Sequence, residues 1–131
     1  MLNFKTITGG FLGGVLGGAA VDLIFIDRAG PSGLFTLMGI TDRLSVFLGH
    51  VILGAIMGIV FVFLLKLFPK INIWLSGILW GLILLLVIGA IPSFFAGGII
   101  NAKTTFFGFL VWIIYGFILS ATVKFFGKNG D

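Results

Sequence analysis

The sequence contains no cysteine, which excludes disulfide bridges and metal sites built from thiolates. It also has few charges: charged residues make up 9% of the chain, against roughly 25% in a typical soluble domain. Hydrophobic residues make up 60% of the chain, and its mean hydropathy is +1.30. A soluble protein needs polar side chains to cover its surface, and this chain has too few. Lipid must therefore surround most of its surface.

The excess of basic residues does not indicate a nucleic-acid-binding surface. The formal net charge is +4 and the isoelectric point is about 9.9. However, the basic residues stand singly at the ends of apolar segments and form no basic stripe. In that position they are typical of topology signals in a membrane protein. We expect the chain to lie in the lipid bilayer and to bind no nucleic acid.

Four apolar segments reach the length of about 20 residues that a membrane-spanning helix needs. They cover residues 6–26, 44–65, 72–91 and 105–125. Backbone groups in hydrocarbon must hydrogen-bond within the chain, and the barrel-like alternation of a β-protein is missing, so we expect helices. The sequence predicts an all-α, polytopic membrane protein with four transmembrane helices, organised as a single transmembrane domain over residues 1–131.

Two residues are expected to define helix ends. Asp42 is suited to cap the second helix, because its carboxylate can accept hydrogen bonds from the free amides of the first turn. Pro92 is expected to end the third helix near Ile91, since proline lacks the amide hydrogen. Beyond it we expect an interfacial segment that holds Phe94 and Phe95.

Two Asp-Arg pairs bracket a segment without charge in the first connection. They are Asp27 with Arg28 and Asp42 with Arg43. We expect each pair to mark where the chain meets the outer membrane surface. The apolar stretch between them, residues 34–40, is expected to lie along the interface as one helical turn that stops at Gly39.

The distribution of lysine and arginine predicts the orientation. Four spans place both termini on one side of the membrane, together with five basic residues: Lys5, Lys66, Lys70, Lys124 and Lys128. The opposite side has three, Arg28, Arg43 and Lys103, which two aspartates partly offset. Because basic residues favour the cytoplasmic side, we expect a multi-pass protein of the prokaryotic inner membrane with both termini cytoplasmic.

The two halves of the chain resemble each other. A shift of 62 residues aligns FLGHVILGAIMG with FLVWIIYGFILS and superposes Gly54 on Gly116. A shift of 61 residues aligns Pro31-Ser32 with Pro92-Ser93. These matches predict an internal repeat, a duplicated helical hairpin whose halves are parallel.

Glycines are concentrated on particular helix faces. The first segment carries two adjacent rows with a spacing of four residues: Gly10, Gly14 and Gly18, and Gly9, Gly13 and Gly17. Without side chains, a neighbouring helix can approach closely, which favours helix association in lipid. We expect a glycine zipper in which Gly10, Gly14, Gly18, Gly54, Gly58 and Gly116 are packing positions. A pore lined by glycine is the alternative.

One intramembrane site is predicted, formed by Asp22 and His50. Asp22 follows Gly18 by four residues and shares its helix face, while His50 begins the glycine row of the second segment. At a rise of about 1.5 Å per residue, Asp22 lies about 7.5 Å inside Asp27. His50 lies about 10 Å inside Arg43 by the same rise, so the two groups have similar depth. The pair either holds the hairpin together or marks a transport pathway.

No motif for catalysis is present. One histidine is too few for a zinc site or a bis-histidine haem, and the sequence has neither a nucleophile motif nor a phosphate-binding loop. We therefore expect no enzymatic activity, no cofactor and no metal. The expected function is that of a scaffold or accessory subunit, with a second copy or another membrane protein as partner. The alternative is a small transporter or channel that uses the Asp22–His50 site.

Two sequence patterns resemble known families. HVILGAIMG in the second segment with WIIYGFILS in the fourth resembles uncharacterised small four-helix membrane proteins of prokaryotes, which also tend to have a glycine-rich first helix. This resemblance covers most of the chain and implies a four-helix membrane fold without an assigned activity. GGAAVDLIF is similar to the first helix of small four-helix translocases of lipid-linked sugars, with Asp22 as their buried aspartate. The end of the second helix in that family is rich in asparagine and arginine, whereas this chain departs from the pattern with FVFLLKLFPK.

Single cysteines introduced into this cysteine-free chain test the orientation. Cysteines at Ser32 and Asn101 should react with a membrane-impermeant maleimide added to intact cells. A cysteine at Asn129 should react only after permeabilisation, because the five-to-three bias of basic residues retains the termini in the cytoplasm. The opposite labelling pattern would reverse the assignment, and labelling of all three sites would indicate mixed insertion.

Overall fold

The computed structural model describes residues 3–29, 33–95 and 102–128, and nearly all of them are helical. The first two long helices are α1 (Phe4–Ala29) and α3 (Arg43–Leu67), and the short helix α2 (Gly33–Leu37) lies between them. The third long helix consists of α4 (Ile73–Leu84), the π-helix η1 (Leu85–Ala90) and α5 (Ile91–Phe95). The fourth is α6 (Ala102–Lys128).

Four segments in the described residues are long and apolar enough to cross a membrane: Phe4–Ile24, Arg43–Leu67, Ile73–Phe95 and Phe106–Gly127. The predicted class, an all-α membrane protein with four transmembrane helices, is thus confirmed. The helices extend the predicted segments by one to four residues at most ends. At the start of α1, for example, the amide of Thr6 donates to Asn3 Oδ1 over 2.8 Å.

The prediction that Pro92 ends the third helix is wrong. The helix continues through Pro92 to Phe95, and the proline is buried. The turn before it is a π-helix, in which the amide of Ile91 donates to the carbonyl of Leu86, five residues earlier. This wider turn accommodates the missing amide hydrogen and the ring of proline without ending the helix.

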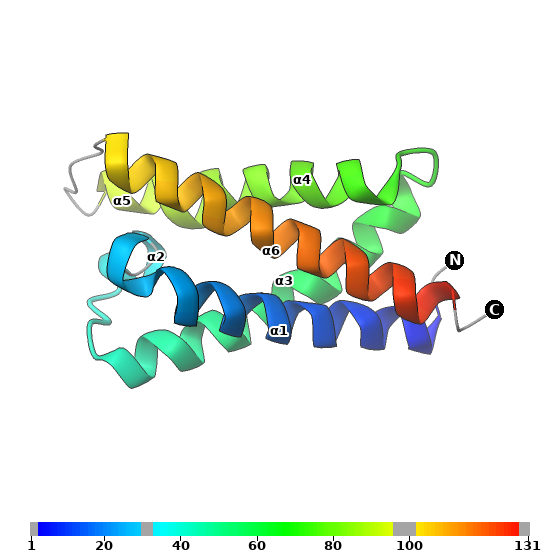
Figure 1. Ribbon diagram of the computed structural model, residues 1–131, viewed down its shortest axis with the longest axis horizontal. Coiled ribbons are helices and arrows are strands. Elements are labelled where there is room, and N and C mark those ends of the chain that lie inside the picture. The colour runs from blue at the N-terminus through cyan, green and yellow to red at the C-terminus, as the bar shows by residue number, and fades with distance from the viewer. Residues whose placement is uncertain (1–2, 30–32, 96–101, 129–131) are drawn as a thin grey trace.

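The long helices follow one another across the bundle in the order α3, α1, α6, α4. Helix α1 packs against both α3 and α6, and α6 also packs against α4. Figure 1 shows both termini at one end of the bundle, while α2 and α5 lie at the other end. Helix α2 contacts α5 and η1 there. Residues from α1, α3, α4, η1 and α6 together form the buried core.

The first glycine row of α1 faces α3. A Cβ at Gly10 would overlap the carbonyl of Gly58, and one at Gly18 would overlap the carbonyl of His50. A Cβ at Gly14 would overlap the carbonyl of Gly54 and lie 2.9 Å from the Cα of Ala55. The backbones of α1 and α3 are therefore in direct contact, which only glycine permits.

The second glycine row faces α6. A Cβ at Gly13 would lie 3.0 Å from the Cβ of Thr122, and one at Gly17 would lie 2.8 Å from Cδ2 of Tyr115. The ring of Tyr115 thus lies over Gly17 and continues toward α3, where its hydroxyl donates to the carbonyl of Gly54 over 2.6 Å. One buried side chain of α6 connects three helices in this way.

A third close contact joins α4 to α6. A Cβ at Gly77 would overlap the carbonyl of Gly116 and the hydroxyl of Ser120, and one at Gly81 would overlap the carbonyl of Trp112. The buried Ser120 hydroxyl donates to the carbonyl of Ile73 over 2.9 Å. Gly116, a packing position predicted from the sequence, lies in this interface opposite Gly77. Gly77 and Gly81 are packing positions that the sequence analysis did not predict.

The structure does not show the duplicated hairpin that the internal alignment predicts. The first span is an uninterrupted helix with glycine rows toward two neighbours, whereas a π-helix interrupts the third span. Pro92 and Ser93 lie inside helix α5, while Pro31 and Ser32 lie outside the described residues. The sequence matches reflect a composition rich in glycine and in large apolar residues.

Paired substitutions of glycine by alanine test the contact between α1 and α3. Gly14→Ala should destabilise the protein by about 1–3 kcal/mol, because the added methyl group forces two backbones apart. Gly108→Ala is the control. The nearest atom to its Cβ is 3.6 Å away, so alanine should be neutral or stabilising by up to about 1 kcal/mol. Unfolding in detergent, followed by circular dichroism, measures both. Equal effects of the two substitutions would contradict the contact.

Candidate intramembrane polar site

Asp22 is enclosed between α1 and α3, and its side chain has no exposed surface. A buried carboxylate needs charged or hydrogen-bonding partners, since burial removes its hydration. Nδ1 of His50 lies 2.5 Å from Oδ2 of Asp22, and Nη2 of Arg43 lies 2.6 Å from Oδ1 in an ion pair. The structure therefore places the two predicted site residues in contact and adds a third group, Arg43.

The local sequence explains why these three side chains meet. Arg43 and His50 are seven residues apart, which is two helical turns, so both project from one face of α3. The close approach of α3 to Gly18 brings that face beside Asp22, one turn further along α1. Helix α3 begins at Arg43 because Asp42 caps it, accepting a hydrogen bond of 2.9 Å from the amide of Ser45.

The cap at Asp42 is a charged one. The hydroxyl and the backbone amide of Ser45 stabilise the carboxylate and hold the pKa of Asp42 below its ordinary value. A negative charge at the first turn is also favourable for the helix dipole. Asp42 therefore fixes the start of α3, and with it the position from which Arg43 reaches Asp22.

Exposure decreases from the start of α3 toward Asp22. The side chain of Arg43 is 49% exposed, that of His50 is 13% exposed and that of Asp22 is 0% exposed. The aliphatic part of an arginine can cross an apolar surface while its charged end stays near water. Arg43 therefore links the exposed start of α3 to the buried carboxylate, and its role as an outer-surface charge stays a prediction.

Helix α2 covers the site at the end of the bundle opposite the termini. The ring of Phe35 lies 4.9 Å from the ring of His50, at an angle of 55°, and is 5% exposed. A Cβ at Gly49 would lie 2.7 Å from Cζ of Phe35, so this glycine makes room for the ring. The opposite face of the segment, with Leu37 and Met38, is exposed.

The end of α2 explains how the chain returns to α3. Gly39 has a φ of 74°. The amide of Ile40 donates to the carbonyl of Phe35, and the amide of Gly39 donates to the carbonyl of Thr36. These bonds form a Schellman motif, which needs the left-handed conformation that glycine adopts at low cost. The helical turn ending at Gly39 was predicted from the sequence, whereas the insertion of Phe35 was not.

The arrangement is suited to holding charge inside the protein and to relaying a proton along Asp22 and His50. With a neutral histidine, the cluster of Asp22, Arg43 and His50 has no formal net charge. Among residues 3–29, 33–95 and 102–128, no group of three or more His, Cys, Asp or Glu side chains is arranged to hold a metal ion. Asp27 and Arg28 belong to the last turn of α1, but their side chains lie outside the described part of the chain.

Two residues of the bundle were not predicted from the sequence: Arg43 as a partner of Asp22, and Tyr115 as a hydrogen-bond donor to α3. The spacing of seven residues between Arg43 and His50 is the signal that could have found the first. No sequence signal identifies the second, since the hydroxyl bonds to a main-chain carbonyl.

Comparison of the chain with family models, with curated proteins and with solved structures found no match.

A double-mutant cycle tests whether Asp22 and Arg43 stabilise each other. Arg43→Gln should destabilise the native protein more than it destabilises the Asp22→Asn variant, with a coupling energy of about 0.5–1.5 kcal/mol. The reason is that the single substitution leaves a buried carboxylate with one partner fewer. Unfolding in detergent measures each corner of the cycle.

Lys66→Gln provides the matched control, because it removes a positive charge from the last turn of the same helix. Its effect should be the same in the native protein and in Asp22→Asn. A coupling of Arg43 to Asp22 no larger than that of Lys66 would contradict the ion pair.

Proposed function

We propose that this chain is a non-enzymatic scaffold or accessory subunit of a membrane assembly. The carrying observation is that each oxygen of the Asp22 carboxylate has its own partner on α3, within 2.6 Å, and that the carboxylate is fully buried. A charge enclosed in this way joins helices and is not presented to a substrate. The resemblance of HVILGAIMG and WIIYGFILS to small four-helix membrane proteins of prokaryotes, inferred from the sequence alone, agrees with this proposal.

An apolar ridge on α3 supports the proposed interaction with a membrane partner. Five residues at intervals of four are all exposed: Leu44, Leu48, Ile52, Ile56 and Val60. Residues at this interval form the ridges that pack into the grooves of a neighbouring helix. We propose that this ridge of α3, which the other described helices leave uncovered, faces another membrane protein or a second copy of the chain.

The proposed location is the prokaryotic inner membrane, with both termini in the cytoplasm. At the end of the bundle that holds the termini, the ammonium of Lys124 lies 5.4 Å from the ring centroid of Trp74. Trp74 also stacks on Phe117, with 5.1 Å between ring centroids. Tryptophan beside lysine is typical of a membrane interface, and the excess of basic residues favours the cytoplasmic interface.

A small transporter or channel is the second candidate. The graded exposure from Arg43 through His50 to Asp22 favours it, because this gradient provides a route from the outer surface to a buried carboxylate. The similarity of GGAAVDLIF to the translocases of lipid-linked sugars belongs to this candidate. Intramembrane ionisable groups often form proton relays, and Asp22 with His50 would be the relay here.

Site-directed photocrosslinking tests the scaffold proposal. A photoreactive phenylalanine at Ile52, on the ridge of α3, should yield one discrete crosslinked protein in cells, because a partner covers this face. The same probe at Leu16 of α1 is the control, since Leu16 is 57% exposed and Ile52 is 59% exposed, yet only Ile52 belongs to the ridge. Leu16 should crosslink to lipid. Equal crosslinking from both sites would contradict a specific partner.

Flux through liposomes containing the purified protein separates the two candidates. The scaffold proposal expects no proton or ion flux above that of empty liposomes. Flux driven by a pH gradient that disappears in folded Asp22→Asn protein would overturn the scaffold proposal in favour of the transporter.

A further inference from the structure

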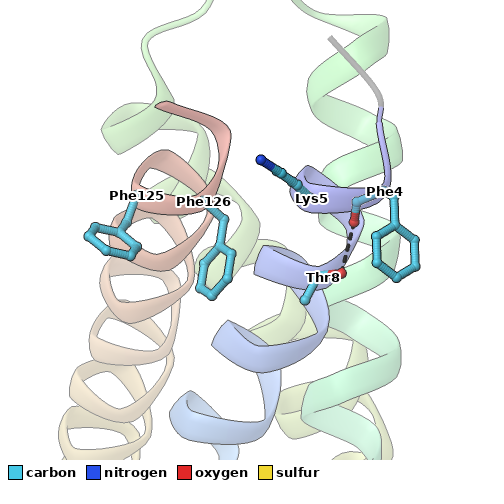
Figure 2. A pocket seen from close by; sticks show the side chains of 5 residues that line it. All are labelled: Phe4, Lys5, Thr8, Phe125 and Phe126. Atoms are coloured by element: carbon cyan, nitrogen blue, oxygen red, sulfur yellow. Dashed lines mark hydrogen bonds between the residues drawn. The ribbon is translucent and has the colours of Figure 1, made fainter. Parts of the chain in front are cut away.

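The groove at the end of the bundle that holds the termini does not lead to Asp22. It lies between the first turns of α1 and the last turns of α6, and Figure 2 shows its mostly apolar lining. Thr8 in this lining precedes Asp22 by fourteen residues, which is about 21 Å along α1. Between them, the two glycine rows of α1 hold its backbone close to α3 and α6. These contacts separate the groove from the buried carboxylate.

The end of the bundle opposite the termini is different, because there α2 lies over the polar cluster. Leu34 of α2 packs against the buried core, and the ring of Phe35 lies 4.9 Å from the ring of His50. Helix α2 also contacts η1 and α5. It therefore bridges α3 and the third long helix, directly above the pair of His50 and Asp22.

The link between α2 and α3 is a single turn that no neighbouring helix supports at its tip. Gly39 has a φ of 74°, and a Cβ at this position would meet no atom within 4 Å. The hydrogen bonds of the Schellman motif hold the turn, so it depends on one residue in a left-handed conformation. Such a turn is a natural hinge for the short helix before it.

Both faces of α2 are apolar. Leu34 and Phe35 point into the bundle, whereas Leu37 and Met38 on the other side are 48% and 62% exposed. In water, displacement of Phe35 would expose an aromatic ring at high cost. In a membrane the ring exchanges the protein interior for hydrocarbon that is equally apolar, so only packing contacts are lost. The cost of moving α2 away from the bundle is therefore low.

We propose that α2 is a lid over the pair of Asp22 and His50. In the closed position, which the structure shows, Phe35 keeps water from the ring of His50. In the open position α2 turns about Gly39 into the surrounding lipid, and water reaches His50 and then Asp22. The lid goes beyond the proposed scaffold function, because it concerns access to the buried pair and not the partner of the chain.

Hydrogen–deuterium exchange at the ring carbon Cε1 of His50 tests the lid. His50 is the single histidine of the chain, and this exchange requires water at the ring. The full chain is placed in lipid nanodiscs in deuterated water, and mass spectrometry follows the exchange. The pH dependence of the rate is measured for each variant, so that a change in the titration of the ring is separated from a change in access. Exchange is slow compared with opening, so its rate reports the open fraction.

Gly39→Ala tests the hinge without removing any atom of the lid. Alanine in a left-handed conformation changes an equilibrium by a factor of about five to thirty, and here its methyl group meets no neighbour. The exchange of His50 should rise by about that factor. Gly39→Asn is the matched rescue, since asparagine adopts the left-handed conformation more readily, and it should exchange at close to the native rate.

Phe35→Ala tests the ring of the lid and should exchange faster than the native protein. Leu37→Ala is its control, because Leu37 belongs to the same turn but points away from the site, and it should exchange at the native rate. Circular dichroism establishes that each variant is folded. If Phe35→Ala unfolds, the comparison of Gly39→Ala with Gly39→Asn decides alone.

Three results would overturn the proposal. Native exchange in Gly39→Ala together with faster exchange in Phe35→Ala would make the ring a fixed cover. Equal acceleration by alanine and asparagine at Gly39 would remove the left-handed turn as the hinge. Native exchange in all variants would mean that water reaches His50 by another route. None of these results depends on a partner at α3, so failure of the scaffold proposal is detected separately by crosslinking.

Discussion

The contact between the backbones of α1 and α3 is the constraint on which the rest of the structure depends. At Gly14 and Gly54 the two helices approach until no side chain fits between them. In hydrocarbon the hydrophobic effect does not drive helices together, so such close van der Waals contact supplies much of the attraction. The same approach brings His50 within hydrogen-bonding distance of Asp22, because Gly18 allows α3 to lie against α1 at that level.

Polar contacts in this bundle join the helices that the glycines bring close together. The hydroxyl of Tyr115 passes over Gly17 and bonds to the carbonyl of Gly54, so the position of α6 is fixed relative to both α1 and α3. At the start of α3, the ion pair of Asp22 with Arg43 joins this helix to α1. Glycine sets the distance between helices, and buried polar groups then select one rotation and one depth for each helix.

Sequence reasoning found the features that follow from helical period. The spacing of four residues placed Asp22 on the face of Gly18, and the rise per residue placed His50 at the same depth. Predictions from the sequence were wrong or missing where a feature depends on which residues lie nearby in the folded structure. The π-helix that carries the chain through Pro92 depends on packing around η1, and the reach of Arg43 depends on the length and flexibility of its side chain. The apparent repeat failed for another reason, since glycine and large apolar residues align readily by composition alone.

The central position of α1 has a consequence for biogenesis. Its span has a mean hydropathy of 1.6, against 2.6, 2.5 and 2.1 for the three that follow, because glycines occupy two of its faces. Among the four long helices of the described residues, α1 is synthesised first, yet one of its two neighbours, α6, is synthesised last. Until then the row of Gly9, Gly13 and Gly17 has no native partner in the membrane. The least hydrophobic of the four helices therefore lacks one of its native neighbours until α6 has been synthesised. Chains truncated before α6 expose this glycine face to any other helix nearby.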